Sequence, residues 1–298
     1  MTYQQLGNSD LYVSKISFGC MSLGNDHSKN ADILYSALDN GINLFDSADL
    51  YQNGGNEISL GKAFQGLRDK VLIATKVGNQ MKPDGSGWDW NPSKAYILKA
   101  VEKSLKRLKT DYLDLYQLHG GTTDDPIDET IEAFEQLKTE GKIRYYGISS
   151  IRPNVIREYV KRANITSVMM QYSIMDRRPE ETCLDLLLKN NIGVLSRGGV
   201  AKGLLIDKPS KPYLNYSEGD VNKLQLEIKE LIDSKKSPAH LAIQFVLKHP
   251  ALTSVVSGIR TNDQLMDLVK IFEVPRMEGE EYSRLQNILP INVYEQHR

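Results

Sequence analysis

The chain has 298 residues, with 37 Lys and Arg against 38 Asp and Glu, and its net charge of −1 provides no basic field for nucleic acid or an anionic membrane. Two cysteines, five scattered histidines and no apolar run of bilayer length argue against a disulfide scaffold, a zinc hydrolase and a membrane-spanning protein. The amino end lacks a signal-peptide pattern, so we expect a cytoplasmic protein with reduced thiols and a sizeable core.

Short apolar runs alternate with amphipathic stretches along nearly the whole chain. Strands that are apolar throughout indicate a parallel sheet with both faces covered. Eight such strands with intervening helices predict a (β/α)8 TIM barrel of the α/β class, formed by residues 1–298 as a single domain. The expected strands are Ile16–Cys20, Asn43–Asp46, Val71–Lys76, Leu113–His119, Tyr145–Ser149, Ser167–Gln171, Gly193–Ser196 and Ser254–Val256.

Capping residues and apolar residues at helical spacing predict the helices between these strands. Gly41 suits the end of a helix over Ser28–Asn40, because glycine readily adopts the left-handed conformation found there. Ser93 suits the N-cap of a helix that runs to Lys109. Further helices are expected from Asp125-Pro126 to Gly141, and at Pro153, Pro179 and Pro238, each of which fits a first turn.

Three segments depart from a plain barrel. Tyr3–Lys15 has the turn residues Gly7-Asn8-Ser9-Asp10 at its middle and predicts a β-hairpin before the first barrel strand. Met81–Pro92 and Lys208–Gly219 are expected to be long loops after the third and seventh strands. Because both loops follow strand ends, they should lie over the face of the barrel where function resides.

Four polar residues stand at or just beyond the carboxyl ends of successive strands: Asp46, Tyr51, Lys76 and His119. A tyrosine of ordinary pKa, about 10, is a poor acid at neutral pH, and a neighbouring ammonium lowers that pKa. We therefore expect Lys76 to activate Tyr51, Asp46 to hold Lys76, and His119 to orient a carbonyl substrate. The four residues together suit proton transfer to or from a carbonyl oxygen.

Each of these residues taken alone has a structural explanation. An Asp at a strand end is usually a helix cap or a loop residue. A single His after an apolar strand is usually a hydrogen-bonded core residue. The alternative for Lys76 is a solvated surface side chain. The joint placement on the second, third and fourth strands favours the catalytic interpretation.

Two longer segments carry a resemblance to a known family. Gly41-Ile42-Asn43-Leu44-Phe45-Asp46-Ser47-Ala48-Asp49-Leu50-Tyr51, continued by Glu57, Gly61 and Lys62-Ala63, and Asp111-Tyr112-Leu113-Asp114-Leu115-Tyr116-Gln117-Leu118-His119 resemble the two signatures of the aldo-keto reductase family. The resemblance extends from Leu6 to about Leu268. It implies a catalytic tetrad of Asp46, Tyr51, Lys76 and His119, with Tyr51 as proton donor and NADPH as hydride donor.

The resemblance also implies how NADP(H) would be held, since no G-x-G-x-x-G fingerprint is present. The backbone of Gly19-Cys20-Met21, together with Asp46, would lie beside the nicotinamide. Ser149 fits a family segment that usually reads Ser-Asn, and Ser150 departs from it. Met169 stands where the family has glutamine, and Gln171, which faces the same side of the strand, would contact the carboxamide unless it is merely a polar strand end.

The remaining cofactor residues belong to the last two strands and the segments that follow them. Arg197 replaces a frequent aromatic residue and would either stack on the nicotinamide or pair with the pyrophosphate. Arg260 suits the 2′-phosphate of NADP, at a helix capped by Thr261 or Asn262, or else is a solvated surface residue. Leu268 stands where the family often has Asn. The other expected cofactor residues are Lys202, Gly203, Leu204, Gly258 and Gln264.

The sequence thus predicts an NADPH-dependent aldo-keto reductase that acts on a small-molecule carbonyl substrate. The resemblance to the family implies a monomer. One alternative is a slow, NADPH-binding redox sensor or regulatory subunit of the same fold, similar to potassium-channel β subunits. Another is a barrel hydrolase or isomerase that uses no nicotinamide. Asn25–His27, Met81–Pro92 and Ile291–Arg298 are expected to form the substrate pocket, where Trp88 and Trp90 either contact an apolar substrate or pack the loop.

Overall fold

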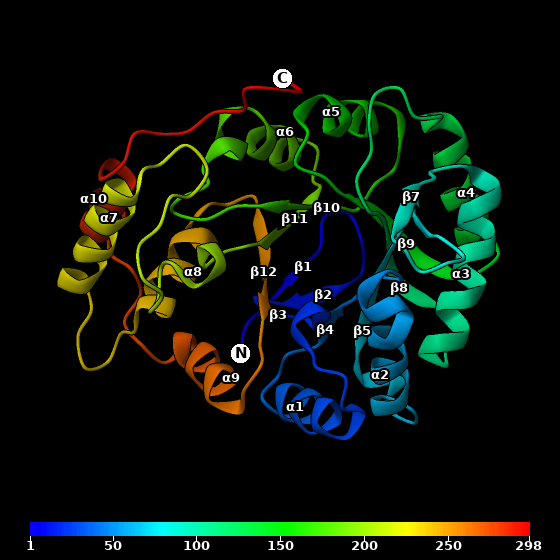
Figure 1. Ribbon diagram of the computed structural model, residues 1–298, viewed down its shortest axis with the longest axis horizontal. Helices are drawn as coiled ribbons and strands as arrows, with labels where there is room; N and C mark the ends of the chain where they lie inside the picture. The colour runs from blue at the N-terminus through cyan, green and yellow to red at the C-terminus, as the bar shows by residue number, and fades with distance from the viewer.

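The computed structural model describes residues 1–298 and contains a closed barrel of eight parallel strands inside a ring of helices (Figure 1). The strands follow around the barrel in the order β10-β11-β12-β3-β4-β5-β8-β9, so neighbours in sequence are neighbours in space. This confirms the predicted (β/α)8 fold. The strands are β3 (Ile16–Gly19), β4 (Leu44–Asp46), β5 (Leu72–Val77), β8 (Leu113–Leu118), β9 (Ile143–Ser149), β10 (Ser167–Gln171), β11 (Gly193–Arg197) and β12 (Leu252–Gly258).

Ten helices accompany the strands, and their caps are largely those that the sequence indicates. Ser93 caps α3 through its side chain, and Gly41 follows α1 with a φ of +87°. Two helices, α7 and α8, separate β11 from β12. The helices are α1 (His27–Asp39), α2 (Gly55–Ala63), α3 (Lys94–Leu108), α4 (Ile127–Thr139), α5 (Pro153–Arg162), α6 (Cys183–Lys189), α7 (Glu218–Leu231), α8 (Pro238–Lys248), α9 (Asn262–Val269) and α10 (Gly279–Asn287). No helix is both long and apolar enough to cross a membrane.

The predicted amino-terminal hairpin is present and closes one end of the barrel. Strands β1 (Tyr3–Gln5) and β2 (Tyr12–Ser14) pair antiparallel, and the segment between them buries Leu6 and Leu11. These two residues belong to a cluster with the inward-facing Leu44, Leu115 and Met169 of the barrel. Burial of such side chains contributes about 1.5–3 kcal/mol each, so the hairpin seals an apolar lower layer of the barrel interior.

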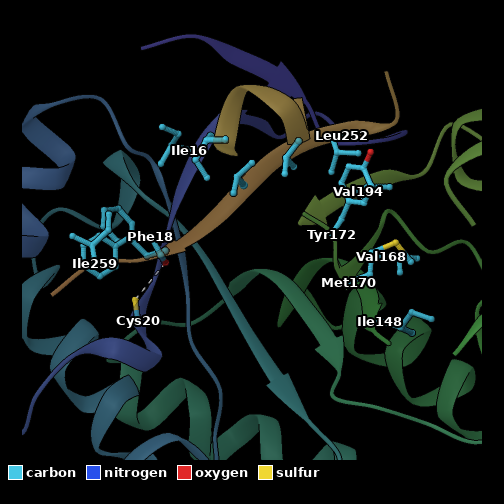
Figure 2. Close-up of a cluster of buried hydrophobic side chains, with 14 of the residues drawn as sticks. Ile16, Phe18, Cys20, Ile148, Val168, Met170, Tyr172, Val194, Leu252 and Ile259 are labelled. Atoms are coloured by element: carbon cyan, nitrogen blue, oxygen red, sulfur yellow. Dashed lines mark hydrogen bonds between the residues drawn. The ribbon is translucent and has the colours of Figure 1, made fainter. Parts of the chain in front are cut away.

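The larger core lies between the barrel and the surrounding helices. Figure 2 shows part of it, with Phe18, Val168 and Val194 extending from their strands on the side away from the barrel interior. Alternate residues along the same strands, such as Met169 and Leu195, join the inner cluster instead. The two-residue period of a strand therefore divides strands such as β10 and β11 between two cores.

Two predicted loops differ from expectation. Met81–Pro92 is not wholly a loop, because β6 (Asn79–Met81) and β7 (Trp88–Trp90) form an antiparallel hairpin in which Met81 pairs with Trp88. Alternating aromatic residues favour a strand on one side, and glycines in the left-handed region at the turn permit the reversal. The Lys208–Gly219 loop is shorter than expected, because Ser217 caps α7 and the helix begins at Glu218.

Candidate active site

A polar layer lies directly above the apolar lower layer inside the barrel. Asp46 follows Leu44 by two residues in β4, and Lys76 follows Ala74 by two residues in β5. Leu44 and Ala74 belong to the inner cluster, so Asp46 and Lys76 face the barrel interior as well. Strand register places Asp46 opposite Ala74 and Lys76 opposite Gln117. The predicted residues of β4 and β5 therefore meet at the carboxyl end of the barrel.

Asp46 and Lys76 form a buried ion pair. Lys76 Nζ donates to Asp46 Oδ2 at 2.6 Å and to the Ser47 carbonyl at 2.6 Å, with the lysine side chain 1% exposed. Burial alone would lower the pKa of Lys76, but Asp46 and then Tyr51 outweigh it and the pKa is raised. Lys76 is therefore an ammonium at neutral pH, held in a fixed position.

Gln117 also belongs to this cluster, although the sequence patterns did not assign it to the site. Its Nε2 donates to Asp46 Oδ1 at 3.3 Å, so the two oxygens of Asp46 have different donors. Gln117 precedes His119 by two residues, and the period of the strand could have identified it as inward-facing. Its Oε1 is buried without a hydrogen-bond partner.

Tyr51 lies beside Lys76, and His119 lies beside Tyr51. Lys76 Nζ is 5.2 Å from the centroid of the Tyr51 ring, and the centroids of the Tyr51 and His119 rings are 5.9 Å apart at an interplanar angle of 83°. The prediction that the pKa of Tyr51 is lowered is wrong. Burial raises this pKa, and the opposing effect of Lys76 is smaller. Tyr51 is therefore a protonated phenol over the whole neutral range.

His119 is a neutral imidazole. Burial, followed by the positive charges of Lys76 and Arg197, lowers its pKa to about 3. Its Nδ1 is buried without a hydrogen-bond partner, whereas its backbone N–H donates to the Val77 carbonyl at 2.7 Å. A neutral ring with one unmatched nitrogen beside a phenol is suited to a hydrogen bond with an uncharged polar group such as a carbonyl.

The chain reverses in an unusual turn directly after Tyr51. Gln52, Asn53 and Gly54 have φ values of 51°, 53° and 86°, and only glycine takes up this region without strain. Gln52 Nε2 donates to the Leu23 carbonyl at 2.6 Å and anchors the turn. A Cβ at Gly54 would lie 2.7 Å from Cδ of Arg107, so a larger residue there would displace the Arg107 side chain.

Behind this turn lies a buried polar network that the sequence does not indicate. Glu57 of α2 is 0% exposed and accepts hydrogen bonds from Thr75 Oγ1 and from Arg107 Nε, each at 2.6 Å. Thr75 precedes Lys76 in β5, and Arg107 lies under Gly54. Asp49 is also buried there, and burial followed by the charge of Glu57 raises its pKa to about 7. The network connects the segments that carry Tyr51 and Lys76.

The residues expected around the nicotinamide come from adjacent strands. Gly19 and Gly258 pair across β3 and β12, and Gly19 also pairs with Asp46. Cys20 is completely buried, and burial raises the pKa of its thiol, so only its backbone is available to a ligand. Met21 is 69% exposed at the barrel rim. These residues lie together at the carboxyl end of the barrel.

Ser149, Ser150 and Gln171 line the opposite part of the rim. Ser149 pairs with Met169 across β9 and β10, and Met169 is buried in the apolar inner cluster. Gln171, two residues further along, belongs to the polar layer and is half-buried. Its position in this layer is consistent with the expected exchange of roles with Met169. Ser150 is buried, and its hydroxyl accepts a hydrogen bond from the Arg152 backbone N–H at 3.2 Å.

The segment after β11 contains two exposed cations and a strained turn. Arg197 and Lys202 are exposed and form no ion pair. Ala201, Lys202 and Gly203 have positive φ values of 46°, 59° and 90°. The side chain of Leu204 is fully buried in the core, so the expected cofactor contact of this residue is restricted to its backbone.

The predicted adenosine end of the site lies at the amino end of α9. Thr261, one of the two expected caps, accepts a hydrogen bond from the Gln264 backbone N–H at 3.2 Å, and the Arg260 backbone N–H donates to Gln264 Oε1 at 3.0 Å. Arg260 is exposed and forms no ion pair. Because β12 lies beside β11 in the barrel, Arg197, Lys202 and Arg260 occupy neighbouring segments of the rim.

Comparison with known proteins identifies the family of this chain. Residues 15–290 match the model of the Aldo/keto reductase family, and the chain belongs to this family of oxidoreductases. It is 48% identical over 307 aligned residues to the uncharacterized oxidoreductase YqkF of Bacillus subtilis (strain 168), with 100% of both chains covered. It is 28% identical over 303 residues to the NADH-specific methylglyoxal reductase of Escherichia coli (strain K12), covering 90% of this chain and 93% of the other.

A solved structure confirms the likeness in three dimensions. The holo form of aldo-keto reductase AKR11C1 from Bacillus halodurans is 51% identical and has a TM-score of 0.95, with 100% of this chain and 99% of that chain covered. The apo form of AKR11C1 is 48% identical over the same coverage, with a TM-score of 0.86. The present fold is therefore nearer to the holo form.

Proposed function

We propose that the barrel domain of residues 1–298 reduces aldehydes or ketones to alcohols with NADPH, and that Tyr51 is the general acid. The observation that carries this proposal is the buried contact between Lys76 and Asp46 beside the Tyr51 ring. A lysine that is 1% exposed requires a partner, and a site that holds an ammonium against a phenol favours proton transfer from that phenol.

Three exposed cations of the rim are suited to the phosphate groups of a dinucleotide. Arg197, Lys202 and Arg260 lack carboxylate partners and lie on neighbouring segments of the rim, where they offer donors to a diphosphate and a 2′-phosphate. Ser149 and Gln171 would hold the carboxamide, and Gly19 would allow close approach of the backbone. When bound, NADPH supplies the hydride. One relative is described as NADH-specific, so membership of the family does not fix the choice of cofactor. The proposed preference for NADPH rests on Arg260, which would bind the 2′-phosphate.

The chain's own residues would perform the proton transfer. The substrate carbonyl oxygen would accept hydrogen bonds from the Tyr51 hydroxyl and from His119, whose neutral ring has an unmatched buried nitrogen. Tyr51 would then give its proton to that oxygen, while Lys76 stabilises the resulting phenolate and Asp46 keeps Lys76 in place. General acid catalysis of this kind contributes roughly 10²–10⁴-fold.

The test is NADPH oxidation with a reactive aromatic aldehyde, comparing wild type with Tyr51→Phe. We expect the variant to lose roughly 10²-fold or more in kcat while retaining NADPH binding, because only the acidic hydroxyl is removed. Comparable turnover in the two proteins contradicts the role of Tyr51. Tight NADPH binding without turnover in either protein favours a redox sensor over a reductase.

A further inference from the structure

One buried side chain, that of Asn56, closes the loop that carries Tyr51. The loop begins at Ser47, directly after β4, and ends at Asn56 in the first turn of α2, nine positions further along the chain. The Ser47 hydroxyl donates to Asn56 Oδ1 at 2.6 Å, so the two ends of this Tyr51 loop are joined. Compact loops whose ends lie close together are frequently functional.

The other end of the Asn56 carboxamide binds a third segment. Asn56 Nδ2 donates to the carbonyl of Cys20, which directly follows β3, at 2.6 Å. Because β3 and β4 are neighbours in the barrel, these two hydrogen bonds join the ends of adjacent strands to the start of α2. We call the pair of hydrogen bonds from Asn56 to Ser47 and Cys20 the Asn56 clasp. The Cys20 backbone is expected beside the nicotinamide, so the clasp reaches the cofactor side of the site.

Ser47 connects the clasp to the lysine of the tetrad. Its carbonyl accepts a hydrogen bond from Lys76 Nζ at 2.6 Å, and its backbone N–H donates to the Ala74 carbonyl of β5 at 2.8 Å. Asp46, the residue before Ser47, accepts a second hydrogen bond from Lys76 Nζ, also at 2.6 Å. A displacement of Ser47 would therefore move both acceptors of the ammonium that is proposed to stabilise the Tyr51 phenolate.

The Tyr51 loop requires such anchors because part of its backbone is strained. Gln52 and Asn53 have φ values of 51° and 53°, in the left-handed region that residues other than glycine adopt at a cost. Strained backbone persists only where the surrounding contacts hold it. Gln52 Nε2 binds the Leu23 carbonyl, and the clasp binds the Cys20 carbonyl, each at 2.6 Å. Both anchors thus attach the loop to the short segment after β3.

Asn56 has no polar atom left for a ligand. Its side-chain oxygen and nitrogen each have a partner at 2.6 Å, and the residue is 0% exposed. Asn56 can therefore affect a reaction only through the positions of the groups that it holds. Such an effect can be large, because a misplacement of about 1 Å can cost about 10²-fold in rate.

We propose that Asn56 is a positioning residue for carbonyl reduction. The clasp holds the Tyr51 loop against the segment after β3, and through Ser47 it fixes the acceptors of Lys76. The phenol and the ammonium therefore meet the carbonyl oxygen in a single geometry. This inference rests on the proposed reductase function, and it gives a role to a residue that touches neither substrate nor cofactor.

The first test follows NADPH oxidation in single turnovers with the reactive aromatic aldehyde. Asn56→Leu removes both hydrogen bonds of the clasp, and we expect the rate to fall about tenfold or more, with a smaller change in the Kd of NADPH. Ser47→Ala keeps the carbonyl that binds Lys76 but loses one hydrogen bond, and should lower the rate roughly 2–10-fold.

The double variant shows whether the two residues act through their shared hydrogen bond. Either substitution removes the bond between Ser47 and Asn56, so the loss in the double variant should be smaller than the product of the two single losses. Independent losses, or an Asn56→Leu rate within about twofold of wild type, overturn the inference while the reductase function stands.

Asn43→Leu is the matched control. The Asn43 carboxamide also joins two positions of another segment, since its Nδ2 donates to the Tyr12 carbonyl and its Oδ1 accepts from the Ser14 backbone N–H, each at 2.8 Å. These contacts lie at the end of the barrel that the amino-terminal hairpin closes. Asn43→Leu should lower stability and leave the single-turnover rate unchanged. A loss of rate equal to that of Asn56→Leu would show that general destabilisation explains both effects, and would overturn the inference.

Asn56→Asp tests the clasp even where Asn56→Leu fails to fold. A protonated carboxyl can donate to the Cys20 carbonyl and accept from the Ser47 hydroxyl, as the carboxamide does, whereas an ionised carboxylate can only accept. The single-turnover rate of Asn56→Asp, relative to wild type at the same pH, should therefore fall as the pH rises from about 5 to about 9. A relative rate that is independent of pH over this range overturns the inference.

Hydrogen exchange separates this inference from the reductase function, because it requires no turnover. Loss of the clasp in Asn56→Leu or Ser47→Ala should speed the exchange of the loop amides, including the hydrogen-bonded N–H groups of Asp49 and Tyr51, by roughly 2–10-fold. Asn43→Leu should leave these amides unchanged. Faster exchange confined to the Tyr51 loop supports the clasp even if the wild type reduces no aldehyde, and unchanged exchange overturns the clasp whatever the activity.

Discussion

Replacement of Arg107 by Met should cost more stability than any exposed ion pair of this protein. Arg107 pairs at 2.6 Å with Glu57, a carboxylate that is 0% exposed and whose other oxygen is bound by Thr75. Arg107→Met keeps the aliphatic stem that lies beneath Gly54 but leaves a buried charge with a single hydrogen bond. Removing one partner of a buried pair typically costs about 3–5 kcal/mol.

That loss is large relative to the usual net stability of about 5–15 kcal/mol. At about 2–4 °C per kcal/mol, the midpoint of thermal unfolding should fall by on the order of 10 °C. Urea unfolding followed by circular dichroism measures the difference directly. Arg162→Met is the matched control, because Arg162 pairs with Asp128, whose side chain is 83% exposed, and such a pair contributes about 1 kcal/mol or less.

A double-mutant cycle isolates the buried charge as the cause. Combining Glu57→Gln with Arg107→Met removes both charges, so the double variant should be more stable than Arg107→Met alone. The reasoning is refuted if Arg107→Met costs under about 1 kcal/mol, or if the effects of the two substitutions simply add. Because the network connects the segments of Tyr51 and Lys76, kcat of the folded Arg107→Met protein should fall more than its KM rises.

Three further predictions concern the cofactor and a buried carboxyl. Arg260→Ala should raise the Kd of NADPH about tenfold or more and leave that of NADH nearly unchanged, because only NADPH has a 2′-phosphate; equal weakening would place Arg260 elsewhere. Gln171→Leu should raise the Kd of NADPH, and an unchanged Kd would mean that Gln171 does not hold the carboxamide. Asp49 has a pKa of about 7 in the folded protein against about 3.9 unfolded, so it contributes stability that is lost as pH rises between those values. Asp49→Asn should therefore be more stable relative to wild type at about pH 8 than at about pH 4, and a pH-independent difference in unfolding midpoint would contradict this.

The sequence by itself determined the barrel and the composition of its upper layer. Each apolar strand is a local pattern, and a polar residue that follows an inward-facing apolar residue by two positions faces the same interior. The strands of Asp46 and Lys76 are adjacent because consecutive parallel strands of a barrel are neighbours. His119 at the end of the next strand joins them for the same reason.

Local patterns also contain limited information about turns. The Asn and Asp residues of the first hairpin were sufficient to predict it, whereas the Met81–Pro92 segment was expected to be a loop although its two tryptophans form a strand. A short strand of three residues has too few alternations to be recognised by period. Its pairing partner, Asn79–Met81, is polar at two of three positions and carries no strand signal at all.

The tertiary structure decided the environment of the four tetrad residues. Arg107 and Glu57 are separated by 50 positions, and their pairing depends on how α2 and α3 pack over the barrel, which no local period specifies. The pKa of Tyr51 is raised because burial outweighs Lys76, a balance that depends on the solvent left around the ring. The carboxyl-terminal segment returns to α5, where the His297 carbonyl accepts a hydrogen bond from the Asn154 backbone N–H, and such long-range contacts are set by packing alone.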